Sequence, residues 1–496
     1  MSSLDIQKVR ASFPALSPNS QFSSSGVPYV FADNAGGSQA LASVVNKISD
    51  YLLNTNAQFG ADYAVSKVAT KRVFEDAQEI ARLVFGYDEG EGDIVWGSST
   101  TLSLEALARS MELGGKIKAG DEIIVTTEHE ANVGPWTKLA SRVGATVKIW
   151  KHSPIPTSTG RPNPFSIGLT LDSLLPLLTP KTRLLAFTGC SNVLGSATPV
   201  ADIVKAVRKK MGELGGSLEV SLDCVAYAPH MKMDVKEWDV DYCSFSWYKV
   251  YGPHLSSMYI RKSLLAAPSS PGEPHLYSLV HHFLSAKPSI SNTALKLQPG
   301  SPGYELVYAT TAVVEYLCGL IGSDVSLTSL TKAFNQLQTH DYTIIQPLLQ
   351  FLTSEAAYTA GVRVVGDEAL STDGKVKHGR APTVSFVFID SSSSSSSSTS
   401  ASTSNKLRKK LWSKSIVGHV DNAGGIGIRY GHFYAYGLGT SLGLLPPQSA
   451  EGEFKNEEEA LEASLEDGVV RVSLVHYNTV EEVERIIAVL KEALGL

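Results

Sequence analysis

Short apolar runs alternate with segments of helical periodicity over much of the first half of the chain. From about residue 85 to 260, runs rich in Val, Ile and Leu are each followed by a stretch in which apolar positions recur at helical spacing. Strands covered by helices on both faces of a sheet have this texture. The pattern predicts an α/β domain built on a large, mostly parallel sheet. The candidate strands are 121–127, 146–150, 183–188, 218–223 and 241–246.

One helix of this domain is predicted with a defined end. The segment 66–85 carries apolar residues along a single stripe and stops before Gly86, a residue type that commonly ends helices. The stripe consists of Ala69, Val73, Ala77, Ile80 and Val84. We expect an amphipathic helix that packs this stripe on the core.

The texture changes after about residue 300, where helical segments become longer and buried strands fewer. This predicts a second, smaller domain of α+β type. We expect an N-terminal segment over 1–30 that packs with the small domain, a large domain over 31–300 and the small C-terminal domain over 301–496. The last helix of the chain starts with Thr479 and Glu482, which are spaced as a capping box. Its apolar face consists of Val483, Ile486, Ile487 and Leu490.

Two stretches in the second half lack the apolar residues that a folded element needs. The Ser-rich segment 391–405 buries too little apolar area to offset its chain entropy, so we expect a flexible surface insertion. The Glu-rich segment 448–467 is expected to be a solvated excursion.

Composition and charge narrow the classes of partner. The chain has 496 residues, and its 43 Lys and Arg against 49 Asp and Glu give a net charge of −6 without a basic cluster, which disfavours nucleic acid. No run approaches the roughly 18 apolar residues that a membrane span needs. The first residues lack a basic stretch followed by an apolar one, so no signal peptide is expected and the protein is predicted to be cytoplasmic.

The four cysteines give no sign of a disulfide framework or a metal site. Cys190, Cys224, Cys243 and Cys318 form no CxxC pair and have no zinc-like spacing with histidines. We expect each to be a small buried hydrophobic residue and no metal to be bound.

The candidate chemistry begins with a lysine at a strand end. Lys249 comes just after the apolar strand 241–246, behind Trp247 and Tyr248, and precedes a Gly-Pro turn. A partly desolvated lysine there has a lowered pKa and can form a Schiff base with an aldehyde, although a lysine snorkelling at a strand end is the simpler reading of this residue alone. Asp223 closes the preceding strand. A lysine paired with an aspartate that protonates a pyridine nitrogen is the arrangement that makes pyridoxal phosphate (PLP) an electron sink.

Other strand ends offer weaker signals of the same kind. His129 follows a strand where an imidazole could stack on the cofactor ring, and the Asn192 amide could bond the ring hydroxyl or a substrate carboxylate. Gly97, Ser98 and Ser99 form a strand-to-helix turn, which suits a phosphate. Each has an ordinary structural explanation when taken alone; their order along the chain favours a PLP site.

With these residues in this order, the chain resembles the class V aminotransferase family of fold-type I PLP enzymes, and within it the cysteine desulfurase-like branch. The family pattern F-S-x-x-K-x-Y-G-P is matched over 245–253. The resemblance extends from VRASFPAL and YVFADNAGGSQ near the start to GIGIRYGH and VVRVSLVHYNT near the end. It implies an aspartate aminotransferase-like fold, PLP as cofactor, a small amino-acid substrate and a homodimer.

The resemblance also implies residue roles. Lys249 is the Schiff-base lysine, Asp223 the partner of the ring nitrogen, and His129 the stacking residue. Asn192 is expected near the ring hydroxyl or the substrate. Ser98, Ser99 and Ser246 are expected near the phosphate, and Ser301 near the phosphate of the partner subunit. Arg471 falls where the family binds the substrate α-carboxylate, and Arg429 lies in the mobile active-site loop.

Three departures from the family pattern limit what carries over. Desulfurases carry a nucleophilic cysteine in the loop, where this chain has Tyr434, and a phenol cannot carry a persulfide. Tyr248 replaces the usual His before the lysine, and Ala226 replaces the usual Gln after the aspartate. Tyr248 is therefore a candidate acid or base. Tyr227, His230 and His432 are further candidates, each equally consistent with a structural role.

The cofactor alone does not fix the reaction. Relatives without the loop cysteine include enzymes that release a β-substituent, enzymes that epimerise amino acids, and enzymes that remove the β-carboxylate of aspartate and add the resulting enamine to an aldehyde. We favour lyase or decarboxylative aldolase chemistry on a small amino acid. A desulfurase or C–S lyase with an external sulfur acceptor, an epimerase and an inactive scaffold remain alternatives.

Overall fold

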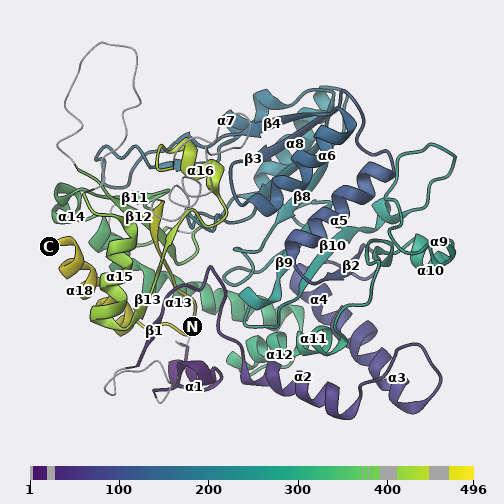
Figure 1. The fold of residues 1–496 in the computed structure, drawn as a ribbon, viewed down its shortest axis with the longest axis horizontal. Coiled ribbons are helices and arrows are strands. Elements are labelled where there is room, and N and C mark those ends of the chain that lie inside the picture. The colour runs from purple at the N-terminus through teal and green to yellow at the C-terminus, as the bar shows by residue number, and fades with distance from the viewer. Residues whose placement is uncertain (1–3, 19–27, 372–373, 378, 391–409, 446–467) are drawn as a thin grey trace, which may run out of the picture.

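The computed structural model describes residues 4–18, 28–371, 374–377, 379–390, 410–445 and 468–496 (Figure 1). The Ser-rich segment 391–405 and the Glu-rich segment 448–467 lie outside these residues, so what the sequence suggests about them stays a prediction. Within the described ranges, no helix is long and apolar enough to cross a membrane, and no group of three or more His, Cys, Asp or Glu is suited to a metal ion.

The larger part of the fold is a seven-stranded sheet in the order β2-β10-β9-β8-β7-β3-β4, parallel except for β10. All five predicted strands are present with nearly the predicted bounds, which confirms the α/β architecture. The strands are β2 (Gly92–Gly97), β3 (Glu122–Thr126), β4 (Thr146–Trp150), β7 (Thr182–Thr188), β8 (Glu219–Asp223), β9 (Tyr242–Ser246) and β10 (Ser256–Arg261).

Helices cover both faces of this sheet, as the apolar strands require. Ile123 and Val125 of β3 pack with α5 (Thr100–Leu113) and α6 (Gly134–Val143). Ile124, on the opposite face, belongs to the core that contains α4 (Ala77–Phe85), α8 (Val200–Glu213) and α12 (Thr311–Leu320). Because the parallel strands all run in one direction, their carboxyl ends lie along a single edge of the sheet.

The helix predicted over 66–85 is present with one irregularity. It is α3 (Ala64–Thr70), a π-helical segment (Lys71–Asp76) and α4, and all five residues of the predicted stripe are buried. Gly86 ends it in the left-handed conformation, with φ 74°. The extra residue of a π turn cannot be read from apolar spacing, because the stripe is kept on both sides of it.

The smaller part is an antiparallel sheet in the order β11-β12-β15-β14, packed with α13 (Leu327–Leu352), α15 (Ser413–Gly424) and α18 (Val480–Leu494). In Figure 1 this sheet lies on one side of the molecule and the seven-stranded sheet on the other. The capping box at Thr479 and Glu482 is formed as predicted. Its strands are β11 (Val362–Val365), β12 (Thr383–Phe388), β14 (Arg429–Gly431) and β15 (Val469–Ser473).

The domain limits set from the sequence stay predictions. Within α13, the apolar residues from Leu330 to Leu337 belong to the core of the large sheet and those from Ile344 to Leu352 to the core of the small one, so this helix spans the two. The N-terminal segment touches both parts. Phe13 packs edge-on against Tyr251 of the large part, and Arg10 forms an ion pair of 2.8 Å with Glu482 of α18 in the small part.

Candidate active site

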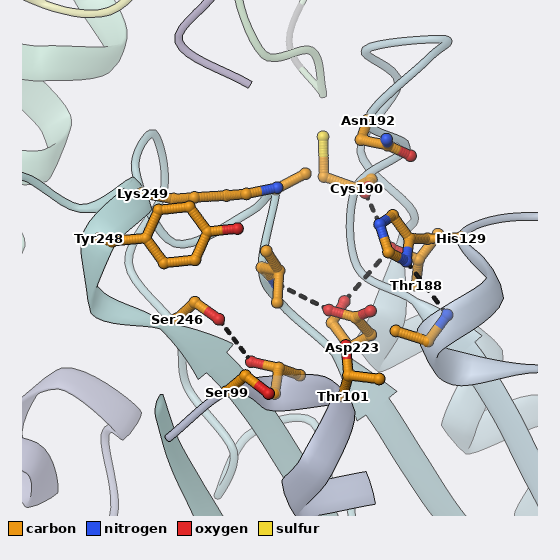
Figure 2. Close-up of a pocket in the computed structure, with 14 residues that line it drawn as sticks. Ser99, Thr101, His129, Thr188, Cys190, Asn192, Asp223, Ser246, Tyr248 and Lys249 are labelled. Carbon is orange, nitrogen blue, oxygen red and sulfur yellow. Dashed lines mark hydrogen bonds between the residues drawn. The ribbon is translucent and has the colours of Figure 1, made fainter. Parts of the chain in front are cut away.

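A cavity lies at the carboxyl ends of β3, β7, β8 and β9, where parallel strands place their following residues side by side (Figure 2). It collects residues that are far apart in the sequence. The predicted site residues that line it are Ser99, His129, Asn192, Asp223, Ser246, Tyr248 and Lys249. The predictions for these seven positions therefore converge on one place, and their chemical roles follow as proposals.

Lys249 ends the 3-10 turn Trp247–Lys249 that directly follows β9, and its side chain points into the cavity (Figure 2). The residue is buried. Burial lowers the pKa of its amine to about 8, with the Arg471 charge adding to the effect and the Asp223 carboxylate opposing it. An amine of this kind is partly neutral, and hence nucleophilic, near neutral pH.

This lowered pKa sets the pH dependence of cofactor loading. At pH 7 roughly a tenth of Lys249 is neutral at a pKa of about 8, against a few molecules in ten thousand for an ordinary lysine. We expect the rate at which PLP reacts with the cofactor-free protein to rise with pH and to level off above a midpoint near pH 8. Stopped-flow absorbance over pH 6–11 measures it. A midpoint near pH 10 would show that the amine is not desolvated in solution.

Asp223, the last residue of β8, lies across the cavity from Lys249 (Figure 2). Its Oδ1 accepts a hydrogen bond from the backbone N–H of Val225 at 2.9 Å, and no described residue donates to Oδ2. Burial raises the pKa of the carboxyl to about 6. A buried carboxylate with one open oxygen needs a cationic or donor partner, and a protonated pyridine nitrogen meets that need.

His129 follows β3 and is held as a neutral ring. Burial, with smaller contributions from Lys249 and Arg471, lowers its pKa to about 4. Its Nδ1 accepts a hydrogen bond from the backbone N–H of Ala131 at 3.2 Å, so Nε2 carries the proton. A neutral imidazole in a fixed orientation suits stacking on an aromatic ring.

The N-terminus of α5 forms the floor of the cavity in Figure 2, near Ser246. Ser99 caps this helix by accepting from the backbone N–H of Leu102, and the Thr100 hydroxyl bonds the Ser246 hydroxyl at 2.8 Å. Thr101 also lines the cavity. Hydroxyls and free N–H groups at a helix N-terminus suit a phosphate. Sequence reasoning missed Thr100 and Thr101, although they continue the run of hydroxyl residues that begins at Ser98.

Two predicted phosphate ligands do not line this cavity. Ser98 and Ser301 both line a neighbouring cavity beside His254. Ser301 accepts a hydrogen bond from the Tyr304 hydroxyl at 3.0 Å. Ser98 faces away because it is the neighbouring residue, Ser99, that turns inward to cap the helix.

Arg471, on β15, lies buried next to the cavity with its side chain only 2% exposed. One Nη donates to Asp33 at 2.8 Å, the other to the Asn192 backbone carbonyl at 3.1 Å, and Nε has no partner among the described residues. Arg429 is half exposed and lies 3.6 Å from the same Asp33 carboxylate. A buried guanidinium edge with an open donor suits a carboxylate. Sequence reasoning assigned no role to Asp33.

The loop that follows β14 covers this arginine. The ring centroid of Phe433 lies 3.8 Å from the Cζ of the Arg471 guanidinium, so the two groups stack. The Phe433 carbonyl accepts a hydrogen bond from the Asn192 side-chain amide at 2.9 Å. The Asn192 amide is thus used by the loop in this structure. Tyr434 is exposed at 61%, its ring centroid lies 5.5 Å from that of His129, and its carbonyl accepts from the Glu130 N–H. Phe433 and Tyr434 both have left-handed φ values, 53° and 58°.

The remaining acid and base candidates divide between the cavity and other places. Tyr248 lines the cavity, and its ring stacks flat on that of His254 with the ring centroids 4.8 Å apart. Burial raises the pKa of the Tyr248 phenol. His432, whose pKa burial lowers, lies in the loop and accepts from the Tyr434 N–H. Tyr227 packs edge-on against Trp238, and His230 is held by Asp341 of α13 at 2.9 Å. Neither of these last two lines the cavity.

One cysteine also lines the cavity, although sequence reasoning treated all four alike. Cys190 follows β7 next to Asn192, and burial raises the pKa of its thiol to about 12. At neutral pH it is therefore a thiol, with little of the thiolate that acts as a nucleophile. All four cysteines are free and buried.

Comparison with known proteins identifies the class V aminotransferase family. The class V aminotransferase model matches residues 30–358. The chain is 35% identical to the aminotransferase-like protein FGM3 of Gibberella zeae, with 99% of each chain covered. It is 28% identical to the cysteine desulfurase-like protein ustD of Aspergillus flavus, with 99% of this chain and 90% of that one covered.

Solved structures agree on the fold. The cysteine desulfurase CsdA of Escherichia coli matches with a TM-score of 0.67 at 22% identity, covering 100% of this chain and 99% of that one. The cysteine desulfurase of Thermococcus onnurineus matches with a TM-score of 0.68 at 19% identity. These matches confirm the predicted fold class.

Proposed function

The chain belongs to the class V aminotransferase family of PLP-dependent enzymes, and from this premise we propose that it is a lyase or aldolase acting at Cα or Cβ of a small α-amino acid. When bound, PLP withdraws electrons from the amino-acid carbon attached to it. Lys249 would hold the cofactor covalently, because its amine is desolvated and lies opposite Asp223. Asp223 would keep a proton on the ring nitrogen through its open oxygen.

The other cavity residues would orient the cofactor and the substrate. His129 would stack on the ring, and Ser99, Ser246 and the N-terminus of α5 would bind the phosphate. Arg471 would bind the substrate α-carboxylate through its guanidinium, whose Nε has no partner among the described residues. Because Phe433 stacks on that guanidinium, the loop would have to move for a substrate to enter.

The observation that carries the choice of reaction is the phenol of Tyr434 beside His129. By the resemblance to desulfurases, the position of Tyr434 is the one at which they carry the sulfur-accepting cysteine. A phenol can donate or accept a proton, but it cannot accept sulfur. Tyr434 and Tyr248 therefore support proton transfer at carbon after a bond to Cα or Cβ is broken.

One assay tests this proposal. The PLP-loaded protein is incubated separately with L-aspartate, L-kynurenine and L-cysteine, and alanine is quantified by mass spectrometry. Loss of the β-substituent followed by protonation at Cβ gives alanine from each. We expect alanine from aspartate or kynurenine, at a rate that falls when Tyr434 is replaced by Phe. Alanine formed only from cysteine, with the sulfur held as a persulfide or released as sulfide by an added thiol, would contradict the proposal.

A cysteine desulfurase, with either a protein thiol or an external thiol as sulfur acceptor, is the second candidate, and one observation bears on it. Cys190 places a thiol in the same cavity as Lys249. If that thiol accepts the sulfur as a persulfide, from which an added reducing thiol releases sulfide, Cys190→Ser should abolish sulfide release from cysteine. If the acceptor is an external thiol, the variant should keep the activity and the rate should depend on the added thiol.

A homodimer and a cytoplasmic location are also part of the proposal. Ser98 and Ser301 line a cavity beside the active site rather than the active site itself. A second copy packed over that cavity could receive Ser301 at its own cofactor phosphate, which is the role the resemblance gives this residue. Light scattering tests the dimer directly.

A further inference from the structure

Glu128, the residue before His129, is a buried carboxylate with no role in the proposed chemistry. Its side chain and that of His152 are each only 4% exposed. One carboxylate oxygen lies 2.8 Å from His152 Nε2, and the other accepts from the Ser191 hydroxyl at 2.8 Å. A buried carboxylate is costly unless it is bonded in this way, so its position is tightly constrained.

The three residues tie together three neighbouring strands. Glu128 follows β3, Ser191 follows β7 and His152 follows β4, and these strands are adjacent in the order β7-β3-β4. Thr127 Oγ1 lies 3.3 Å from His152 Nδ1. A single neutral tautomer of His152 satisfies both contacts, with Nε2 donating to Glu128 and Nδ1 accepting from Thr127. The carboxylate is therefore the bridge on which the loops after these strands meet.

Glu128 and Ser191, the two ends of one hydrogen bond in this bridge, each precede a residue that lines the active-site cavity. His129 follows Glu128 directly, and Asn192 follows Ser191 directly. The Ser191 hydroxyl also accepts from the backbone N–H groups of Val193 and Leu194, which shapes the turn that carries Asn192. A shift of the carboxylate would thus move both loops.

We propose that Glu128 is a positioning residue that holds the loops carrying His129 and Asn192 in register with each other at the cofactor site. The inference rests on the proposed contacts of these two residues with PLP. It predicts energetic coupling, because residues that act through one another give non-additive effects when they are replaced together.

The test is a double-mutant cycle read as the affinity for PLP. Cofactor-free wild-type protein, Glu128→Ala, the double variant His129→Ala/Asn192→Ala and the triple variant are each titrated with PLP and followed by visible circular dichroism. We expect Glu128→Ala to weaken binding about tenfold or more in the wild type, and less than about threefold where both partner side chains are already gone. Equal losses in both backgrounds would overturn the proposal.

Asp241→Ala is the matched control. Asp241 is a buried carboxylate that also ties neighbouring strands, accepting from the Val220 N–H and from Arg208, but at the amino edge of the sheet just before β9. We expect it to lower the melting temperature and leave the PLP affinity unchanged. If Asp241→Ala weakens PLP binding as much as Glu128→Ala does, Glu128 acts only through stability and the proposal fails.

Ser191→Ala keeps the test decisive if Glu128→Ala does not fold. It removes only the arm that leads to Asn192, so its effect on PLP affinity should be non-additive with Asn192→Ala and additive with His129→Ala. Additivity with both would overturn the inference. A wild-type protein that gains no visible signal with PLP would instead overturn the proposed function, which separates the two failures.

Discussion

Replacing Lys249 by Met is expected to abolish covalent cofactor attachment and to reduce turnover by about a thousandfold or more, the scale of loss for a group that acts directly on the reacting atoms. Lys249 is buried at the end of β9, and its amine is the one that faces Asp223 in the cavity. Borohydride reduction of the PLP-loaded protein, followed by peptide mass spectrometry, should place the reduced cofactor on Lys249 and nowhere in the variant.

Lys296 provides the control for this experiment. It is also buried, burial also lowers its pKa to about 8, and its amine donates to the carbonyls of Leu265 and Leu276 away from the active-site cavity. Lys296→Met should destabilise the protein and still bind PLP covalently. A reduced cofactor on Lys296, or labelling that persists in Lys249→Met, would contradict the assignment.

The strands of the large sheet could be predicted because a strand that is buried on both faces is a short run of apolar residues in the sequence. Each predicted strand is an apolar run short enough to be read alone. Asp223 is the last residue of such a run, and His129 and Lys249 each follow one within three residues. In a parallel sheet the ends of neighbouring strands must meet, so placing these residues at strand ends was enough to bring them together.

The environment of Arg471 could not be predicted in this way. Its partner Asp33 comes from the start of the chain, and Phe433 comes from a loop of the small part. Asp33 reaches Arg471 because its segment bridges to Ser473 at the end of β15, and Phe433 reaches it because β14 pairs with β15. No local pattern records which distant segment will lie beside a strand of a small antiparallel sheet.

Side-chain direction at turns was the second limit. Ser98 and Ser99 are identical in type and adjacent in sequence, yet only Ser99 lines the cavity, because it caps α5. Cys190 looked like the other three cysteines, and only the turn after β7 turns it into the cavity. Such choices are made by one or two dihedral angles, which residue type alone does not fix.

Replacing Asp223 by Asn is expected to reduce turnover by about a hundred- to a thousandfold, the scale at which one preorganised charge contributes to a reaction. The amide keeps the shape of the side chain and can still accept from Val225, but it carries no charge to hold a proton on the ring nitrogen. The change should therefore act on the chemistry more than on folding.

The pH dependence of PLP binding separates this role from a purely structural one. The carboxyl pKa is raised to about 6 in the cofactor-free site, so the group is ionised above that pH and neutral below it. We expect PLP affinity in the wild type to fall as the pH drops through 6, and this step to be absent in Asp223→Asn. In Asp341→Asn, which alters an equally buried carboxylate paired with His230 outside the cavity, the step should remain. If Asp223→Asn keeps the step, another group holds the ring nitrogen.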